Sequence, residues 1–262
     1  MPSYQLQVVG YVRSPYKQKF AIPRQPGLIA EAKAELVLEK GFDDDAMVRG
    51  IEAFSHLWLV FVFHETADKG WSPLVRPPRL GGNEKKGVFA TRATFRPNPV
   101  GLSVVKLEGV VRRQGRLVLQ LSGVDLLDNT PVLDIKPYLP YADALPEALG
   151  GFADSAPETD MTVSFSEQAS AFCQHQTHYP DLRLLIEKVL KQDPRPQYKK
   201  QKSDSQSYGM TLYHFNIKWT VNGGHNHVTE IHQLQNRATG PVAMPGADDG
   251  PGAVSQPEPC GG

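Results

Sequence analysis

The apolar residues of the first 150 positions fall in short runs separated by turns rich in proline and glycine. The longest run, HLWLVFVFH at 56–64, is too apolar to have a wet face, so it predicts a central strand. A turn at 112–115 separates two further alternating runs and indicates a hairpin. With about seven short strands, one helix and no βαβ alternation, residues 1–155 are predicted to form a closed or nearly closed β-barrel.

Two local predictions concern the start of this barrel. Alternation over residues 4–13 predicts the first strand, which ends at the turn Ser14-Pro15. Asp43, Asp44 and Asp45 precede AMVRGIEAF, a pattern typical of a helix whose positive end is capped by acids. These aspartates are therefore interpreted as caps and not as metal ligands.

Residues 156–235 contain patterns of both helices and strands, unlike residues 1–155. They predict a small α+β domain beside the mainly β domain. We expect a strand at 161–165, helices at 166–177 and 182–192, one long amphipathic strand at 208–221, and a turn at Asn222-Gly223 that leads into 227–234. In residues 236–262, 11 of 27 positions are proline or glycine, which predicts a disordered tail.

Charge and cysteine content narrow the functional class. With 28 basic and 28 acidic residues the chain is not a globally basic nucleic-acid wrapper, although residues 69–99 carry seven basic residues against one acidic. The basic connector after the second helix is either a solvated linker or a nucleic-acid contact. Cys173 and Cys260 supply neither a disulfide framework nor a zinc set, and no run could cross a bilayer or act as a signal peptide. A reducing cytoplasm is the expected location.

The stretch GVFATRATFRPNPVGLS at 87–103 predicts a strand, a stiff loop and another strand. Its prolines bias Arg96 and Asn98 towards extended geometry, and Gly101 permits a close backbone approach. Guanidinium groups on a rigid loop suit an anionic or amide-bearing ligand, whereas the alternative is a hairpin whose arginines face water. Leu80-Gly81-Gly82 lies in a loop and lacks the strand and helix of a dinucleotide fingerprint, so a doubly wound fold is not expected.

Several motifs in one order closely resemble the TsaA-like, TrmO-type tRNA methyltransferases. They are SPYKQKFAIPRQPG, FSHLWLVFVFH, RPPRLGG, GVFATRATFRPNPVGLS and TPVLDIKPYLP, and DPRPQY resembles the C-terminal domain of the bacterial members. The resemblance implies a β-barrel that binds S-adenosylmethionine and a homodimer that acts on the tRNA anticodon arm. The implied reaction methylates the exocyclic amine of N6-threonylcarbamoyladenosine at position 37.

The resemblance also implies where the cofactor binds. The implied cofactor-binding residues are Gln25, Pro26, Gly27, His64, Glu65, Arg92, Leu102, Ser122, Gly123, Val124 and Asp125.

The motif DIKPY adds candidates for catalysis. Asp134 or a neighbouring carbonyl would accept the proton or hydrogen bond of the acceptor amine, and Tyr138 would stack on the base. A strand-end aspartate bound to backbone amides is the alternative. The predicted substrate contacts are Arg96 and Asn98, for the threonyl carboxylate, together with Lys136, Arg195, Lys199 and Lys200.

Two other functional classes remain open at this point. A non-catalytic barrel could bind S-adenosylmethionine or RNA as a sensor, because no covalent nucleophile demands chemistry. A metal-dependent hydrolase could use His225, His227 and His232, but these residues lack a matching carboxylate–histidine cluster, so no metal is expected.

Overall fold

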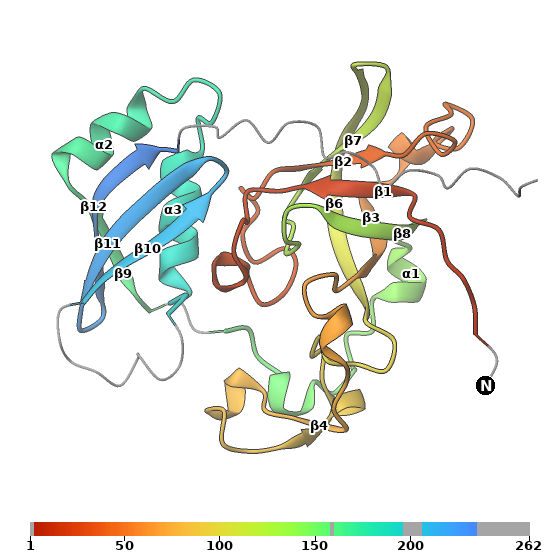
Figure 1. Cartoon of the computed structure of the whole chain (residues 1–262), viewed down its shortest axis with the longest axis horizontal. Helices are drawn as coiled ribbons and strands as arrows, with labels where there is room; N and C mark the ends of the chain where they lie inside the picture. Colours follow the sequence, from red (N-terminus) through yellow and green to blue (C-terminus); the bar gives the residue numbers. More distant parts are fainter. Residues whose placement is uncertain (1–2, 158–159, 196–205, 235–262) are drawn as a thin grey trace, which may run out of the picture.

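The computed structural model describes residues 3–157, 160–195 and 206–234 (Figure 1). A barrel with a projecting arm occupies one side of the molecule, and a smaller sheet with two helices occupies the other. The predicted mainly β class with a separate C-terminal α+β unit is confirmed. The tail predicted at 236–262 lies outside the described residues.

Six antiparallel strands form the barrel in the order β1-β2-β7-β6-β3-β8. The order closes on itself because β1 pairs with β2 on one edge and with β8 on the other. The strands are β1 (Gly10–Arg13), β2 (Ala34–Leu38), β3 (His56–Val62), β6 (Val100–Arg113), β7 (Arg116–Ser122) and β8 (Thr130–Pro137).

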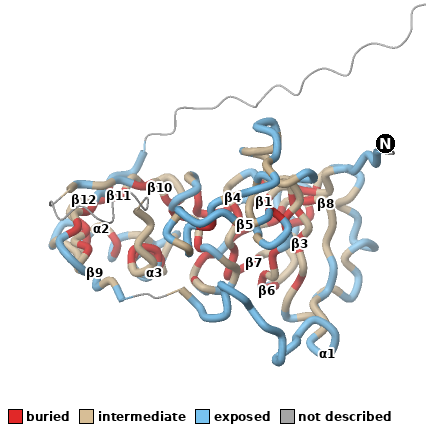
Figure 2. The backbone as a smooth tube through the Cα atoms, turned by 90° about the horizontal axis from the view of Figure 1, so that it is seen from below, coloured by how far each residue is buried: buried red, intermediate tan, exposed pale blue. Residues whose placement is uncertain are grey.

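Buried residues lie along the barrel strands (Figure 2), and in β1, β2 and β3 they alternate with half-buried or exposed ones. In β3, Leu57, Leu59 and Phe61 are buried, whereas the residues between them are only half-buried. The prediction that β3 is central is confirmed, since it pairs with β6 and β8. The expectation of two covered faces was wrong, because a barrel strand buries only its inward face.

Residues 64–99 form an arm that extends from the barrel next to residues 140–155 (Figure 1). It contains a two-stranded sheet of β4 (Leu74–Val75) and β5 (Lys86–Gly87). Arg79 Nη2 donates to Ser155 Oγ at 2.9 Å and joins the two segments. Short helices complete this region: η3 (Ala67–Lys69), η4 (Pro78–Leu80), η5 (Val88–Ala90), α1 (Pro140–Asp143) and η6 (Gly151–Ala153). The strand expected at 88–90 is therefore the 3-10 turn η5.

The C-terminal unit is a four-stranded sheet in the order β10-β11-β12-β9, packed against two helices. Its elements are β9 (Thr162–Phe165), α2 (Glu167–Gln174), α3 (Leu182–Lys191), β10 (Gln206–Leu212), β11 (Phe215–Asn222) and β12 (His225–Gln233). The Ser166 side chain caps α2 by accepting from Ala169 N at 3.1 Å. Every third or fourth residue of α3 is apolar, and Leu182, Leu185 and Val189 are buried on that face. Among the described residues, no helix is long and apolar enough to cross a membrane.

Three predicted elements were wrong. Asp44 Oδ1 accepts from Ala46 N at 2.8 Å in a tight turn, and Gly50 has φ +85°, so only the 3-10 turn η2 (Ile51–Ala53) forms where a helix was expected.

The strand predicted at 208–221 is two strands, because the chain reverses at Tyr213, where φ is +53°. The first strand begins at Gly10 and not at residue 4, since Tyr4 and Leu6 are exposed and lack covering partners.

The structure predicts a specific cost for adding a methyl group at Gly101. A Cβ at this position would lie 2.3 Å from Cζ of Phe61, so the ring that packs closely against Gly101 belongs to the barrel core. We expect Gly101→Ala to lower the free energy of unfolding by about 1–3 kcal/mol, measured by chemical denaturation. Gly87→Ala, where a Cβ meets nothing within 4 Å, should have little effect. Equal stability of the two variants would contradict this packing.

Candidate functional site

Two irregular loops meet at one end of the barrel through their glycines. Gly27 N, in the segment between β1 and β2, donates to Gly123 O, just after β7, at 2.8 Å. Both residues have left-handed φ angles, +76° and +70°, which favour glycine. A Cβ on Gly123 would approach Gly27 Cα to 3.5 Å. The two predicted cofactor motifs, 25–27 and 122–125, are thus held in contact.

Arg92 joins the same place from the loop after η5. Its Nη1 donates to Gln25 Oε1 at 2.5 Å. The guanidinium also lies near enough to Asp125 to lower the pKa of that carboxyl. Gln25, Gly27, Arg92, Gly123 and Asp125 therefore form one group, which we call the loop cluster.

Asp125, the acidic residue of the loop cluster, has a perturbed pKa. Burial raises its pKa to about 6, against the opposing effects of a Ser103 hydrogen bond and Arg92. Ser103 Oγ donates to Asp125 Oδ1 at 2.5 Å, and Ser103 is fully buried on β6. Ser103 was missed by sequence reasoning, although a polar residue at an inward position of an apolar strand is an available signal.

The neighbours of this cluster are engaged elsewhere. Ser122 Oγ donates to Glu108 Oε1 at 2.5 Å, and Val124 is a fully buried core residue. Pro26 lies between Gln25 and Gly27 but has no described hydrogen bond. The side chains of Ser122 and Val124 are thus engaged away from the loop cluster.

A second group of predicted residues lies on the outer face of the barrel. Leu102 pairs with Val60, and Val60 pairs with Asp134, so these three residues form one row across β6, β3 and β8. Leu102 and Asp134 are consequently about 10 Å apart on the same face. Asp134 is half-exposed, its Oδ2 lies 2.6 Å from Lys136 Nζ, and its Oδ1 accepts from Ile135 N at 2.9 Å.

Tyr138 extends this row along the same face. Its ring centroid lies 6.0 Å from that of Trp58, whose strand partner is Lys136. We call Leu102, Asp134, Lys136, Tyr138 and Trp58 the outer row. Sequence reasoning missed Trp58, although its place in the apolar run at 56–64 made it visible.

The remaining candidates lie near the arm. His64 and Glu65 follow β3, and His64 Nε2 is 3.8 Å from Glu65 Oε1. Arg96 Nη1 donates to the carbonyl of Thr91 at 2.7 Å and also contacts the carbonyls of Val88 and Ala93. Arg96 therefore braces the loop that carries Arg92, and exposed Asn98 stands two residues further along.

The predicted RNA contacts of the C-terminal unit are only partly described. Arg195 forms a bidentate ion pair with Asp193, with distances of 2.7 and 3.0 Å, and its side chain is only 9% exposed. Hydrogen bonding to Asp193 is the main cause of the raised pKa of this guanidinium. Lys199 and Lys200 lie outside the described residues.

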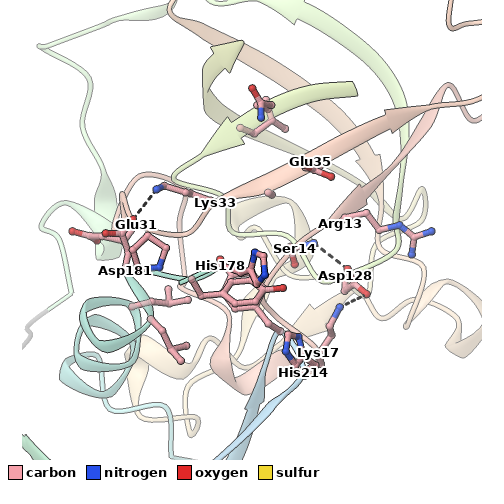
Figure 3. Close-up of a pocket in the computed structure, with 18 of the residues that line it drawn as sticks. Arg13, Ser14, Lys17, Glu31, Lys33, Glu35, Asp128, His178, Asp181 and His214 are labelled. Atoms are coloured by element: carbon pink, nitrogen blue, oxygen red, sulfur yellow. Dashed lines mark hydrogen bonds and ion pairs between the residues drawn. The ribbon is translucent and has the colours of Figure 1, made fainter. Parts of the chain in front are cut away.

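A groove of about 1190 Å³ lies between the barrel and the C-terminal unit (Figure 3). Its walls are tied by Lys33 Nζ and Asp181 Oδ2 at 2.6 Å, and Lys17 and Asp128, which both line the groove, form an ion pair at the same distance. None of the predicted cofactor or catalytic residues lines this groove. The sequence did not indicate it, because its two walls come from distant segments.

The histidines of the C-terminal sheet are bound to other side chains. Ser164 Oγ lies 2.8 Å from both His225 Nε2 and His227 Nδ1, whereas His232 Nε2 contacts Glu230. Within the described ranges, no three His, Cys, Asp or Glu side chains come together in a way that could hold a metal ion.

The pKa of Asp125 predicts a pH dependence of stability. Its pKa is higher in the folded protein than the ordinary 3.8, so its contribution to stability is full below pH 3.8 and is lost as the pH rises through about 6. The loss amounts to at most about 3 kcal/mol. Asp125→Asn should remove this dependence in denaturation measured from pH 4 to 8, and Ser103→Ala should move its midpoint to higher pH. Identical profiles in all three proteins would contradict the assignment.

Comparisons with known proteins place the chain in a family. The sequence matches the tRNA-methyltransferase O N-terminal domain over residues 11–144 and the TrmO C-terminal domain over residues 158–234. It is 52% identical to a tRNA (adenine(37)-N6)-methyltransferase of Escherichia coli, with 84% of this chain and 94% of that protein covered.

Two further similarities concern Pseudomonas aeruginosa. A protein provisionally named an S-adenosylmethionine-dependent methyltransferase is 48% identical, over 83% of this chain and 92% of its own length. A crystal structure of TrmO superposes with a TM-score of 0.69 at 40% identity and covers 88% of this chain and 99% of the other. Both halves of the sequence and the fold agree, and the chain therefore belongs to the tRNA-methyltransferase O family.

Proposed function

We propose that this protein is an S-adenosylmethionine-dependent methyltransferase that modifies the exocyclic amine of adenosine 37 in tRNA. The names of its relatives and its family membership support this reaction. We propose N6-threonylcarbamoyladenosine as the substrate nucleoside and the cytoplasm as the location. The observation that carries the proposal is the meeting of 25–27, Arg92 and 123–125 in the loop cluster.

The chemistry of the loop cluster fits S-adenosylmethionine. The cofactor carries a carboxylate and an ammonium group, and the cluster offers the guanidinium of Arg92 and the carboxylate of Asp125. Gly27 and Gly123 lack side chains, so their backbone groups can approach a ligand closely. When bound, the cofactor supplies an electrophilic methyl group on a sulfonium. Arg92 would orient it, and Asp125, when ionised, would favour its positive charge.

The outer row supplies groups suited to the acceptor base. The amine of a modified adenine is a weak nucleophile, so a positioned acceptor for its proton lowers the barrier. We assign this role to Asp134 or a neighbouring carbonyl. Tyr138 and Trp58 offer aromatic faces on which the base can stack. Lys136, which pairs with Asp134, lies where it can contact the RNA backbone.

The loop cluster and the outer row are linked to opposite faces of β6, through Ser103 and Leu102. This separation favours a site that is completed by a second subunit. Ser103, which bonds Asp125, points inward, whereas the adjacent Leu102 points outward and is 59% exposed. Phe89 on the arm is 80% exposed. We propose a homodimer in which exposed apolar residues of the arm and of β6 are covered, and the outer row of one subunit faces the loop cluster of its partner.

For tRNA, we propose contacts with the cationic arm and with Lys199 and Lys200 of the C-terminal unit. The arm carries the seven basic residues found between 69 and 99. Arg96, with Asn98, is proposed to bind the threonyl carboxylate. Arg195 would support this surface indirectly, through its ion pair with Asp193.

The direct test of the function is incubation with S-adenosylmethionine and tRNA, followed by mass analysis of anticodon-loop nucleosides. One added methyl group on the modified adenosine at position 37 is the expected result. A protein that binds the cofactor but leaves every nucleoside unchanged would instead be a sensor.

A substitution at Asp134 tests the catalytic assignment. Asp134→Asn keeps the shape but loses the carboxylate, so we expect kcat to fall about 10²-fold or more. The dissociation constant for S-adenosylmethionine should stay within about twofold, because the described polar partners of Asp134 are Lys136 and Ile135 N, and we assign its role to the acceptor base. Lys136→Met, which removes the ion-pair partner and the proposed RNA contact but keeps the carboxylate, should have a smaller effect on kcat and act mainly on the KM for tRNA. Wild-type kcat in Asp134→Asn would refute the role.

Arg96→Ala tests recognition of the threonyl carboxylate. We expect the variant to lose most of its preference for modified over unmodified adenosine, measured as the ratio of kcat/KM for the two tRNAs. Because Arg96 also braces the Arg92 loop, cofactor affinity is measured in parallel and defines the part of the effect that comes from this loop. A variant that discriminates as well as the wild type would exclude Arg96 from substrate recognition.

A further inference from the structure

The segment at 14–33, which carries Gln25 and Gly27, has little regular structure of its own. It connects β1 to β2 and contains only the short helix η1 (Lys19–Ala21). Backbone of this kind is positioned by tertiary contacts and not by a hydrogen-bonded ladder. The precision of the loop cluster therefore depends on what holds the ends of this segment.

The C-terminal unit holds the first end through the β10–β11 hairpin. Tyr213 N donates to Pro15 O at 2.7 Å, and Tyr16 forms an isolated β-bridge with Leu212. Thr211 N donates to Gln18 Oε1 at 3.4 Å. The backbone of Pro15 and Tyr16 and the side chain of Gln18 are thereby tied directly to the neighbouring sheet.

The conformation of Tyr213 is an independent sign that this contact matters. Its φ of +53° lies in the left-handed region, which costs a residue with a side chain roughly 1 kcal/mol. The ring packs on Tyr179, with centroids 4.3 Å apart, and the same residue presents its N–H to Pro15. Packing and hydrogen bonding together retain a conformation that a glycine would adopt more easily.

The second end of the segment is tied across the groove. Lys33 Nζ lies 2.6 Å from Asp181 Oδ2, at the start of α3 (Figure 3). Both ends of residues 14–33 are thus attached to the C-terminal unit, while the middle contacts Arg92 and Gly123.

Tyr16 connects the first end to the loop cluster. It is fully buried, and its hydroxyl has no hydrogen-bond partner among the described residues. Burial raises its pKa, and the nearby Tyr213, Asp125 and Glu31 raise it further. Tyr16 thus pairs with the hairpin of the C-terminal unit, and it lies near enough to Asp125 for that carboxylate to raise its pKa.

We propose that the C-terminal unit is a positioning element of the methyl-donor site, in addition to any contact with tRNA. Gln18, Tyr213 and the Lys33–Asp181 pair act as positioning residues that hold 14–33 so that Gln25 and Gly27 meet Arg92 and Gly123. This inference rests on the proposed cofactor role of the loop cluster. It implies that displacing the C-terminal unit weakens cofactor binding without altering the chemical step.

The test is a charge swap in the full-length chain. Lys33→Glu should weaken S-adenosylmethionine binding by about three- to tenfold in calorimetry and raise its KM equally, with kcat at saturating cofactor unchanged. The double variant Lys33→Glu/Asp181→Lys should restore binding to within about twofold. Gln18→Ala should act in the same direction as Lys33→Glu. Lys218→Glu is the matched control, because its pair with Glu230 lies within the C-terminal sheet.

Hydrogen exchange separates this inference from the proposed function. Amides of residues 19–28 should exchange faster in Lys33→Glu than in the wild type, and the swap should restore them, whether or not the protein binds the cofactor. Unchanged exchange and unchanged affinity in Lys33→Glu and Gln18→Ala would overturn the positioning role. If the variants show this exchange pattern but the wild-type protein binds no S-adenosylmethionine, the proposed function is refuted and the positioning role is not.

Discussion

The hydrogen bond from Gly27 N to Gly123 O joins the two loops on which the candidate site depends. Each glycine has a positive φ, and neither loop has regular structure at this point. The closed barrel fixes the second loop because Ser122 ends β7, and the segment at 14–33 brings the first. This contact brings Gln25, which accepts a hydrogen bond from Arg92, to the loop that carries Asp125.

The alternation of β6 divides the site chemically. Ser103 faces inward and binds a buried carboxylate whose pKa is raised, and Leu102 faces outward, on the same face of the barrel as Asp134. A charged methyl donor suits the first environment, where opposite charges are close and partly shielded from water. A planar base suits the second, where Tyr138 and Trp58 expose aromatic surface. A strand with two-residue periodicity thus accounts for two chemically different environments within a few residues.

Predictions from sequence succeeded where a local pattern determined the structure. The apolar run at 56–64 became β3, the turn at 112–115 became the β6–β7 hairpin, and the helices predicted at 166–177 and 182–192 became α2 and α3. The resemblance to a family implied which loop residues bind the cofactor. In the structure, 25–27, Arg92 and 123–125 of this set lie together. The reversal at Tyr213 was missed because a tyrosine with positive φ is held by distant contacts with Pro15 and Tyr179. Ser103 and the groove were missed for the same reason, since their partners are distant in sequence.

We propose that the loop cluster binds the methyl donor, and a crystal structure with S-adenosylhomocysteine, the demethylated product, would show where that ligand lies. We expect the ligand to lie against residues 25–27, Arg92 and 123–125, with its amino-acid end near Arg92 and Asp125. A ligand bound in the groove between barrel and C-terminal unit, with the loop cluster untouched, would contradict it.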